Sequence, residues 1–172
     1  MATKKSVVIL FGILAMSSLI LGSAIQVGAE TIHWKFYTWV NKAQEVPIDD
    51  VEGHVVRFVE RGDFFVLENG EVATGKSIAT VDFIKGSGTY TEYVTITFQD
   101  GSTMIRKNQG TVRGVFAGGS GDIKSEIIKG TGRFEGAKGT ASSTIKYLPL
   151  EKGEAGPKGY GETTFTYTLP SK

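Results

Sequence analysis

Apolar and polar residues alternate along most of the chain after residue 29. Residues 163–169 read TTFTYTL and residues 93–98 read YVTITF, so that every second side chain is apolar. This period of two predicts β-strands with one buried face, because successive side chains of a strand point to opposite sides. No segment after residue 29 shows the sustained 3.6-residue apolar stripe of a long helix. Further strands are predicted over residues 32–40, 54–60, 64–67, 77–85, 103–107, 111–116, 122–129 and 142–147.

Two dipeptides predict tight turns between these strands. Asn69-Gly70 and Asp100-Gly101 each separate two alternating segments, and both dipeptides accept the positive φ angles of a two-residue hairpin. The strands on either side are therefore expected to be antiparallel neighbours. Longer loops are predicted over residues 41–53 and over the glycine-rich residues 153–159.

Eight or more short strands without a helix predict an all-β fold. A closed antiparallel barrel and a two-sheet sandwich both protect the edges of such strands. Nine glycines lie between residues 110 and 140, and glycines within strands favour the bends that a closed sheet needs. We therefore predict an antiparallel β-barrel of about eight strands.

The first 29 residues differ from the rest of this 172-residue chain. Lys4 and Lys5 precede an uncharged stretch over residues 6–29 that ends in small residues, which predicts a signal peptide cleaved near Ala29. The mature protein would then be a single β-barrel domain over residues 30–172, exported to a bacterial periplasm or to the extracellular medium. The alternative is an uncleaved segment long enough to cross a bilayer, which would be the protein's contact with a membrane.

The composition excludes several kinds of chemistry. The chain has no cysteine, so it contains no disulfide, thiolate nucleophile or cysteine-ligated metal. The formal net charge of +1 gives no reason to expect binding of nucleic acid. His33 and His54 are the only histidines and stand in no metal-binding motif. We therefore expect neither a metal ion nor another cofactor.

Two further motifs have simple interpretations. Residues 70–77 match the phosphate-binding pattern GxxxxGK[ST], but that motif must open a helix, whereas here it begins at a hairpin turn and continues as a strand. We therefore expect no nucleotide. Asp49 and Asp50, with Glu45 and Glu52, lack the spacing of a calcium-binding loop, which indicates a solvated acidic loop.

One glycine-rich segment resembles a known family. Residues 127–140 read IIKGTGRFEGAKGT and resemble the late hairpin Gly-x-Gly-x-[Phe/Tyr]-x-Gly-x-x-Gly of the allene oxide cyclase and dirigent-like β-barrel superfamily. We interpret this segment as a fold signature without catalytic content, in which the aromatic residue anchors a sharply bent turn. The resemblance continues through the strands over residues 142–147 and 164–169. The matching positions are Gly130, Gly132, Phe134, Gly136 and Gly139.

The resemblance implies an eight-stranded antiparallel barrel with an apolar lumen. In the plant cyclases of this superfamily, a first-strand glutamate, a nearby asparagine and a proline line the pocket. Asn41 and Pro47 would correspond to the last two, whereas Trp39 or Thr38 stands at the place of the glutamate. The missing acid argues against the plant cyclase reaction. The candidate ligand-binding residues are therefore Trp39, Asn41 and Pro47.

Three functions are open at this point. The first is binding of a small apolar ligand in the lumen without catalysis. The second is an isomerase or cyclase acting on a fatty-acid-like, polyketide or phenolic substrate, which a carboxylate or tyrosine facing the lumen would favour. The third is a structural or oligomerisation module whose lumen is filled by side chains. Because dirigent-like barrels often form trimers, the resemblance also implies a homo-oligomer.

Overall fold

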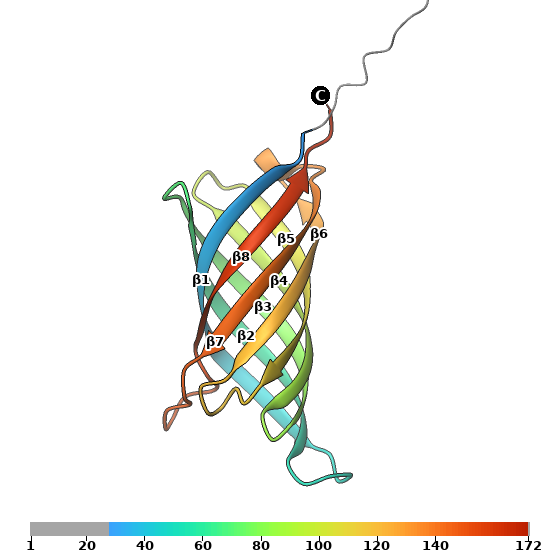
Figure 1. Cartoon of the computed structure of the whole chain (residues 1–172), viewed down its shortest axis with the longest axis vertical. Helices are drawn as coiled ribbons and strands as arrows, with labels where there is room; N and C mark the ends of the chain where they lie inside the picture. Colours follow the sequence, from blue (N-terminus) through green and yellow to red (C-terminus); the bar gives the residue numbers. More distant parts are fainter. Residues whose placement is uncertain (1–27, 172) are drawn as a thin grey trace, which may run out of the picture.

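The structure is a closed barrel of eight antiparallel strands (Figure 1). It is a computed structural model and describes residues 28–171. Each strand pairs with the next along the chain, and β8 closes the barrel against β1. A short 3-10 helix, η1 (Gly132–Phe134), lies between β6 and β7. The strands are β1 (Glu30–Pro47), β2 (His54–Leu67), β3 (Val72–Ile84), β4 (Ser87–Phe98), β5 (Thr103–Arg113), β6 (Ser120–Gly130), β7 (Lys138–Tyr147) and β8 (Gly159–Thr168).

Alternating side chains build the interior of the barrel. Every second residue of β3 is buried from Ala73 to Phe83, and the apolar face predicted for β8 points inward. The buried apolar residues form two clusters. The upper cluster, at the end where the chain terminates in Figure 1, includes Trp34, Phe65, Leu67, Val94, Ile96, Phe98, Met104, Phe134, Phe165 and Tyr167. The lower cluster includes Val59, Val81, Phe83, Tyr90, Val112, Val115, Ile123, Ile145 and Tyr147.

The glycine signature lies in the segment that covers the upper end. Gly130 ends β6, and a Cβ atom at this position would overlap the carbonyl oxygen of Phe134. Gly136 has a φ of +72°, a left-handed conformation that other residues adopt at a cost. The connection therefore folds back sharply, and the ring of Phe134 enters the upper cluster with its centroid 4.6 Å from that of Phe98.

Two connections cover the lower end. Residues 114–119 follow β5, and residues 148–158 join β7 to β8. Within the second connection, Gly156 and Pro157 are buried, and a Cβ atom at Gly156 would lie 3.1 Å from the Cβ atom of Val40. The 148–158 connection therefore packs against the inner wall and covers the lower opening.

The predicted loop over residues 41–53 is shorter in the structure. β1 continues to Pro47, so only residues 48–53 form the connection to β2. Residues 34–38 pair with both β8 and β2, whereas residues 30–33 pair with β8 alone and residues 42–47 with β2 alone. The side chains of this last part are mostly exposed, which explains why the sequence there lacks apolar alternation.

Four of the predicted strands join in pairs to form two longer strands in the structure. The segments 54–60 and 64–67 belong to β2, and the segment 103–107 belongs to β5 together with the first three residues of the predicted segment 111–116, whose last three residues lie beyond the end of β5. The gaps between them contain polar residues and glycine, such as Arg61-Gly62-Asp63. These residues interrupt the apolar alternation, but the pairing of β2 with β3 continues through them without a shift, and the pairing with β1 has a single bulge beside Arg61.

The two predicted hairpins are confirmed, but their connections span residues 68–71 and 99–102, and only the glycine of each dipeptide has a positive φ. Gly70 and Gly101 have φ angles of +85° and +81° in the β2–β3 and β4–β5 turns. Residues 72–77 continue as β3, so the GxxxxGK[ST] pattern opens no helix. The predicted signal peptide falls almost entirely on residues 1–27, outside the described residues, and its cleavage stays a prediction. Residues 28–171 include no helix of the length and apolarity required to span a membrane.

Candidate functional site

A polar layer crosses the barrel between the two apolar clusters. All eight strands contribute at least one inward side chain to this layer, which we call the waist. These side chains are buried, although those of ordinary small barrels are apolar at such positions. The waist residues are Thr38, Arg61, Asp63, Ser77, Glu92, Arg106, Asn108, Ser125, Ser143 and Thr163.

Cross-strand pairing brings the waist residues together. Thr38 is opposite Asp63, Ser77 is opposite Arg61, and Asn108 is opposite both Glu92 and Ser125. Because opposite residues of neighbouring strands place their Cβ atoms about 5 Å apart, the register alone positions the layer. The strand alternation therefore determines that these polar groups face the lumen.

One ion pair at the waist is well compensated. Arg61 Nη1 lies 3.3 Å from Glu92 Oε1, and Asn108 Nδ2 donates a 2.8 Å hydrogen bond to Glu92 Oε2. Burial acts to lower the pKa of Arg61, but the charge of Glu92 and smaller contributions from its other neighbours raise that pKa overall. Both oxygens of Glu92 and the charge of Arg61 are thus satisfied within the layer.

Arg106 is a second buried cation, and its charge is compensated less completely than that of Arg61. Its guanidinium carbon lies 5.0 Å from the centroid of Trp34 and 5.9 Å from that of Phe65. Burial lowers the pKa of Arg106 to about 10, because the charges of Glu92 and Asp63 offset only part of the cost of burying the cation. Nε and Nη1 of Arg106 have no hydrogen-bond partner among residues 28–171.

Asp63 is a buried carboxylate and is also compensated incompletely. Burial, and then the charge of Glu92, raise its pKa from 3.8 to about 6. Oδ2 of Asp63 has no hydrogen-bond partner in the described chain, and Asp63 and Arg106 form no ion pair there. The layer thus contains an unpaired acceptor and an unpaired cation that do not meet.

A small cavity lies between these groups. Its volume is about 30 Å³, and Asp63, Glu92, Arg61, Arg106 and Asn108 all line it. Asn108 Oδ1 also has no partner in the described chain. A cavity of this size has room for about two water-sized groups, so the waist offers unpaired donors and acceptors to a guest of that size. This polar centre differs from the apolar lumen that the resemblance implies.

A second, smaller cavity continues towards the lower end. It has a volume of about 10 Å³, and its lining includes Arg61, Tyr147 and Pro157. Arg61 lines both cavities, and Pro157 lines the lower one. Arg57 Nη2 donates a 3.2 Å hydrogen bond to the carbonyl oxygen of Ala155, which holds the 148–158 connection in place. This connection thus contributes Pro157 to the cavity that lies next to the waist.

The three predicted ligand-binding residues lie away from the waist. Trp39 is on the outer face of β1, where its ring covers Gly62 and its Nε1 donates a 2.9 Å hydrogen bond to Asn41 Oδ1. Asn41 is the extra residue of a β-bulge between Val40 and Lys42. Pro47 is the last residue of β1. The structure therefore brings Trp39 and Asn41 together outside the barrel, and their role in ligand binding stays a prediction.

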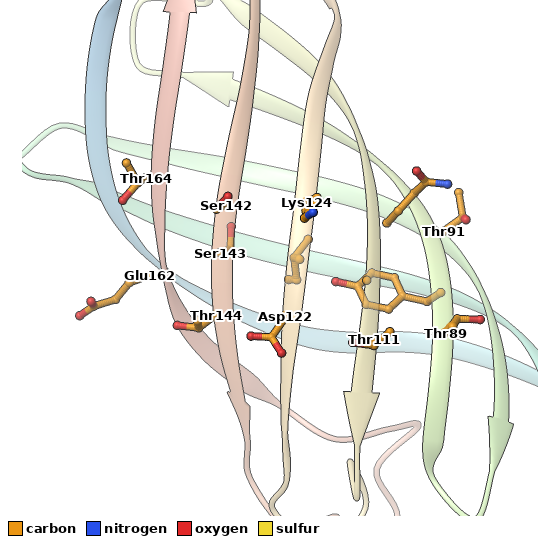
Figure 2. A pocket seen from close by; sticks show the side chains of 14 residues that line it. Thr89, Thr91, Thr111, Asp122, Lys124, Ser142, Ser143, Thr144, Glu162 and Thr164 are labelled. Carbon is orange, nitrogen blue, oxygen red and sulfur yellow. The ribbon is translucent and has the colours of Figure 1, made fainter.

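The outer wall has a broad hollow over β4 to β8 (Figure 2). Its volume is about 800 Å³, and it is open to solvent. The outward side chains that line it are short hydroxyls with a few charges. None of these outward side chains is buried, so the hollow lacks the desolvated groups that distinguish the waist. They are Thr89, Thr91, Gln109, Thr111, Asp122, Lys124, Ser142, Thr144, Glu162 and Thr164.

His54 forms a separate polar contact at the lower end. Its Nδ1 lies 2.6 Å from Asp50 Oδ1 and its Nε2 lies 2.8 Å from Asp82 Oδ1. Hydrogen bonds to Asp50 and Asp82 raise the pKa of His54. The predicted acidic loop thus has a structural contact in Asp50, and Glu45 belongs to β1 and pairs with Arg57. Residues 28–171 contain no group of three or more His, Asp or Glu side chains arranged to hold a metal ion.

The sequence analysis missed the waist although a signal was present. Glu92 continues the inward face of Val94 and Ile96, and Arg106 follows Met104 at the same parity. Charged residues at positions of inward parity are the pattern of a buried polar layer. The pattern becomes visible once the segments on either side are recognised as single long strands.

Three solved structures share this barrel. The pterocarpan synthase dirigent protein GePTS1 has 15% identity and a TM-score of 0.51, with 84% of this chain and 92% of that chain covered. The pterocarpan synthase dirigent protein PsPTS1 has 14% identity and a TM-score of 0.51, with coverages of 84% and 97%. A protein of unknown function from the DUF3224 family of Shewanella oneidensis MR-1 has 15% identity and a TM-score of 0.52, with coverages of 84% and 100%.

These similarities concern the fold. No family model and no curated protein matches the sequence. The likeness to the three structures confirms the barrel fold expected from the resemblance of residues 127–140. Because fold alone does not determine function, the function has to be argued from the waist.

Proposed function

We propose that this protein binds a small amphipathic molecule inside the barrel, with the polar group of the molecule at the waist. The observation that carries the proposal is the buried polar layer, in which Arg106, Asp63 and Asn108 have unpaired polar atoms around a cavity. Replacing buried charges by apolar residues of similar volume often stabilises a protein. A layer that keeps them at a cost in stability therefore favours a binding role over a purely structural one.

The proposal modifies the first sequence hypothesis in one respect. An apolar guest would leave the unpaired atoms of the waist without partners, and each would then carry a desolvation cost of about 1–3 kcal/mol. A guest with a polar group removes that cost, while its apolar part displaces the lower cover and contacts the lower cluster. We therefore expect an amphipathic ligand in place of a wholly apolar one.

The ligand can be sought directly. The protein is purified without denaturation from cells that produce it, studied by native mass spectrometry, and extracted with organic solvent. We expect one adduct per barrel, and we expect Arg106→Met to lose the adduct while keeping the far-ultraviolet spectrum of the fold. A clean mass, with no thermal shift across a panel of fatty acids and phenolics, would instead favour the packed structural barrel.

A reversible disulfide tests whether the ligand enters the barrel past the 148–158 connection. Val40 and Gly156 have Cβ positions 3.1 Å apart, slightly below the range of about 3.5–4.5 Å in disulfides, so the connection has to move outward a little to form one. The chain has no other cysteine, so Val40→Cys with Gly156→Cys would form one defined disulfide between β1 and the 148–158 connection. We expect the oxidised protein to take up ligand at least about tenfold more slowly than the same protein after reduction. Equal rates would place the entrance elsewhere.

An isomerase or cyclase is a second candidate. Asp63, with a pKa raised to about 6, would exchange a proton near neutral pH, and Tyr90 and Tyr147 also belong to the buried lower cluster. The test is incubation of the extracted ligand with the ligand-free protein, followed by mass spectrometry and chromatography of the product. An isomer formed by the wild type and not by Asp63→Asn, with binding retained in both, would establish catalysis. Unchanged ligand would leave binding as the function.

A further inference from the structure

The waist contains two positive and two negative groups. The cations are Arg61 and Arg106, and the anions are Asp63 and Glu92. Their formal charges sum to zero when both carboxyl groups are ionised. An additional buried charge in such a layer is costly unless another charge compensates it. The charge of any guest at the waist is therefore restricted by these four residues.

Of the two cations, only Arg106 is available to a guest. Arg61 is paired with Glu92, and both Glu92 oxygens already accept hydrogen bonds. Arg106 keeps two nitrogens without an acceptor in the described chain and lines the 30 Å³ cavity. The cavity has room for about two water-sized groups, which is close to the space that the two oxygens of a carboxylate occupy.

Of the two acids, Asp63 is the one that can take up a proton. Its Oδ2 is unpaired and lines the same cavity, so a protonated Asp63 would donate a hydrogen bond to a guest oxygen. Both oxygens of Glu92 are already paired, one with Arg61 and the other with Asn108. After a guest with one negative charge has bound, one proton on Asp63 would return the summed charge of the waist and the guest to zero.

We propose that the waist binds a monoanionic carboxylate group, which accepts hydrogen bonds from Arg106 and from Asp63, and that Asp63 takes up one proton from solvent on binding. This inference rests on the proposed binding function and assigns the chemical class of the polar group. A dianion, such as a phosphate monoester, would need a second compensating proton. The waist therefore selects carboxylates over phosphates.

The environment of Asp63 makes it the group that titrates. The charged or titratable groups that line the same cavity are Arg61 on β2, Glu92 and Tyr90 on β4 and Arg106 on β5, and Tyr147 on β7 lies next to Arg61. Burial raises the pKa of Tyr90 and that of Tyr147, so both phenols stay protonated between pH 6 and 8. β1 and β3 present the neutral Thr38 and Ser77. The raised pKa of Asp63 thus couples carboxylate affinity to pH.

The two tryptophans of the chain provide a readout with an internal control. Trp34 is inside, next to Arg106, whereas Trp39 is outside and bonded to Asn41. The indole N–H signals of the purified, isotopically labelled protein are followed by NMR during titration with acetate or propionate. The matched neutral probes are acetamide and propionamide. We expect the carboxylates to shift the Trp34 signal in a saturable way and to leave the Trp39 signal unchanged.

Acetate binding measured at several pH values tests whether Asp63 takes up a proton when the carboxylate binds. One proton taken up per carboxylate bound predicts that the acetate affinity falls by about tenfold for each pH unit above the pKa of Asp63. In Asp63→Asn the affinity should no longer depend on pH between 6.5 and 8. In Arg106→Met, whose fold is checked by its spectrum, the shift of Trp34 should disappear.

The outcomes separate this inference from the function on which it rests. Equal shifts with acetamide and acetate, or a pH-independent affinity in the wild type, would overturn the inference while leaving a polar guest at the waist. No shift of Trp34 with any probe would overturn it as well. In that case the native mass measurement decides the binding function, because an adduct without a carboxylate supports the function and contradicts only the inference.

Discussion

Arg106 stacks on Trp34 inside the barrel, with its guanidinium carbon 5.0 Å from the ring centroid. Trp34 in turn stacks on Phe165, with centroids 5.5 Å apart and an interplanar angle of 10°. The upper cluster thus ends in an aromatic face on which a cation rests, and a cation–π contact of this kind offsets part of the cost of burial. Arg106 also lies over the ring of Phe65, so these two contacts are part of the boundary between the apolar and polar layers of the lumen.

Replacing Arg106 should show how much the buried charge of this residue lowers the free energy of unfolding. At pH 5, where Asp63 is protonated, we expect Arg106→Met to leave the free energy of unfolding unchanged or to raise it by up to about 2 kcal/mol, because an incompletely paired charge is replaced by an apolar chain. Urea denaturation measures this change. A loss of more than about 2 kcal/mol would show that the Trp34 contact is needed for folding.

Arg61→Met is the matched control for this variant. It removes a guanidinium from the same layer but breaks the pair with Glu92, in which the two side chains are only 11% and 7% exposed. Removing one partner leaves a buried charge uncompensated, which typically costs about 3–5 kcal/mol. The two arginines should therefore respond in clearly different ways to the same substitution.

Asp63 should make the barrel less stable as the pH rises. Its pKa is about 6 in the folded chain against an ordinary 3.8, so the folded state binds more protons between these values. Protonated Asp63 therefore contributes its full stabilisation of the folded state below about pH 3.8, and this stabilisation is lost as the pH rises through 6. Asp63→Asn keeps the uncharged form at every pH. We expect its free energy of unfolding to exceed that of the wild type by about 3 kcal/mol at pH 8 and by little at pH 4, as measured by urea denaturation at both pH values.

His54 should titrate above the ordinary value of 6.5. Hydrogen bonds to Asp50 and Asp82 raise its pKa, so the stability that this contact provides is present below pH 6.5 and is lost as the pH rises through the raised value. An NMR titration distinguishes His54 from His33, the only other histidine. We expect Asp82→Asn to lower the pKa of His54. A His54 pKa below 6.5 in the wild type would mean that the imidazole is neutral between its two carboxylates.

The glycine signature should be sensitive to a single methyl group. Ala in place of Gly130 would bring a Cβ atom onto the carbonyl oxygen of Phe134, and we expect a loss of about 3 kcal/mol from overpacking. Gly101→Ala is a control, because it meets no atom within 4 Å and is disfavoured only by a φ of +81°. Its expected cost is about 1–2 kcal/mol. Thermal denaturation of both variants compares the two effects, and equal losses would deny the close approach at Gly130.

The sequence alone determined the fold. Alternation of apolar residues sets which face of each strand is buried, and the turn chemistry at Gly70 and Gly101 makes neighbours antiparallel. Both are local properties, since they depend on residues two to four positions apart. The glycine pattern from Gly130 to Gly139 is equally local. Alternation and turns left both a barrel and a sandwich open, and the glycines together with the resemblance of residues 127–140 favoured the closed barrel that the structure has.

Only the tertiary structure decided where the candidate site lies. Trp39 and Asn41 were chosen from the first strand, but the register places the ring of Trp39 over Gly62 on the outside, and a one-residue change of register would have exchanged the two faces. Asp63, Glu92 and Arg106 are separated by up to 43 positions in the sequence and meet because closure of the sheet brings β2, β4 and β5 around one lumen. Burial then gives these groups their chemistry, because the same side chains on the outer wall would be solvated and electrostatically independent.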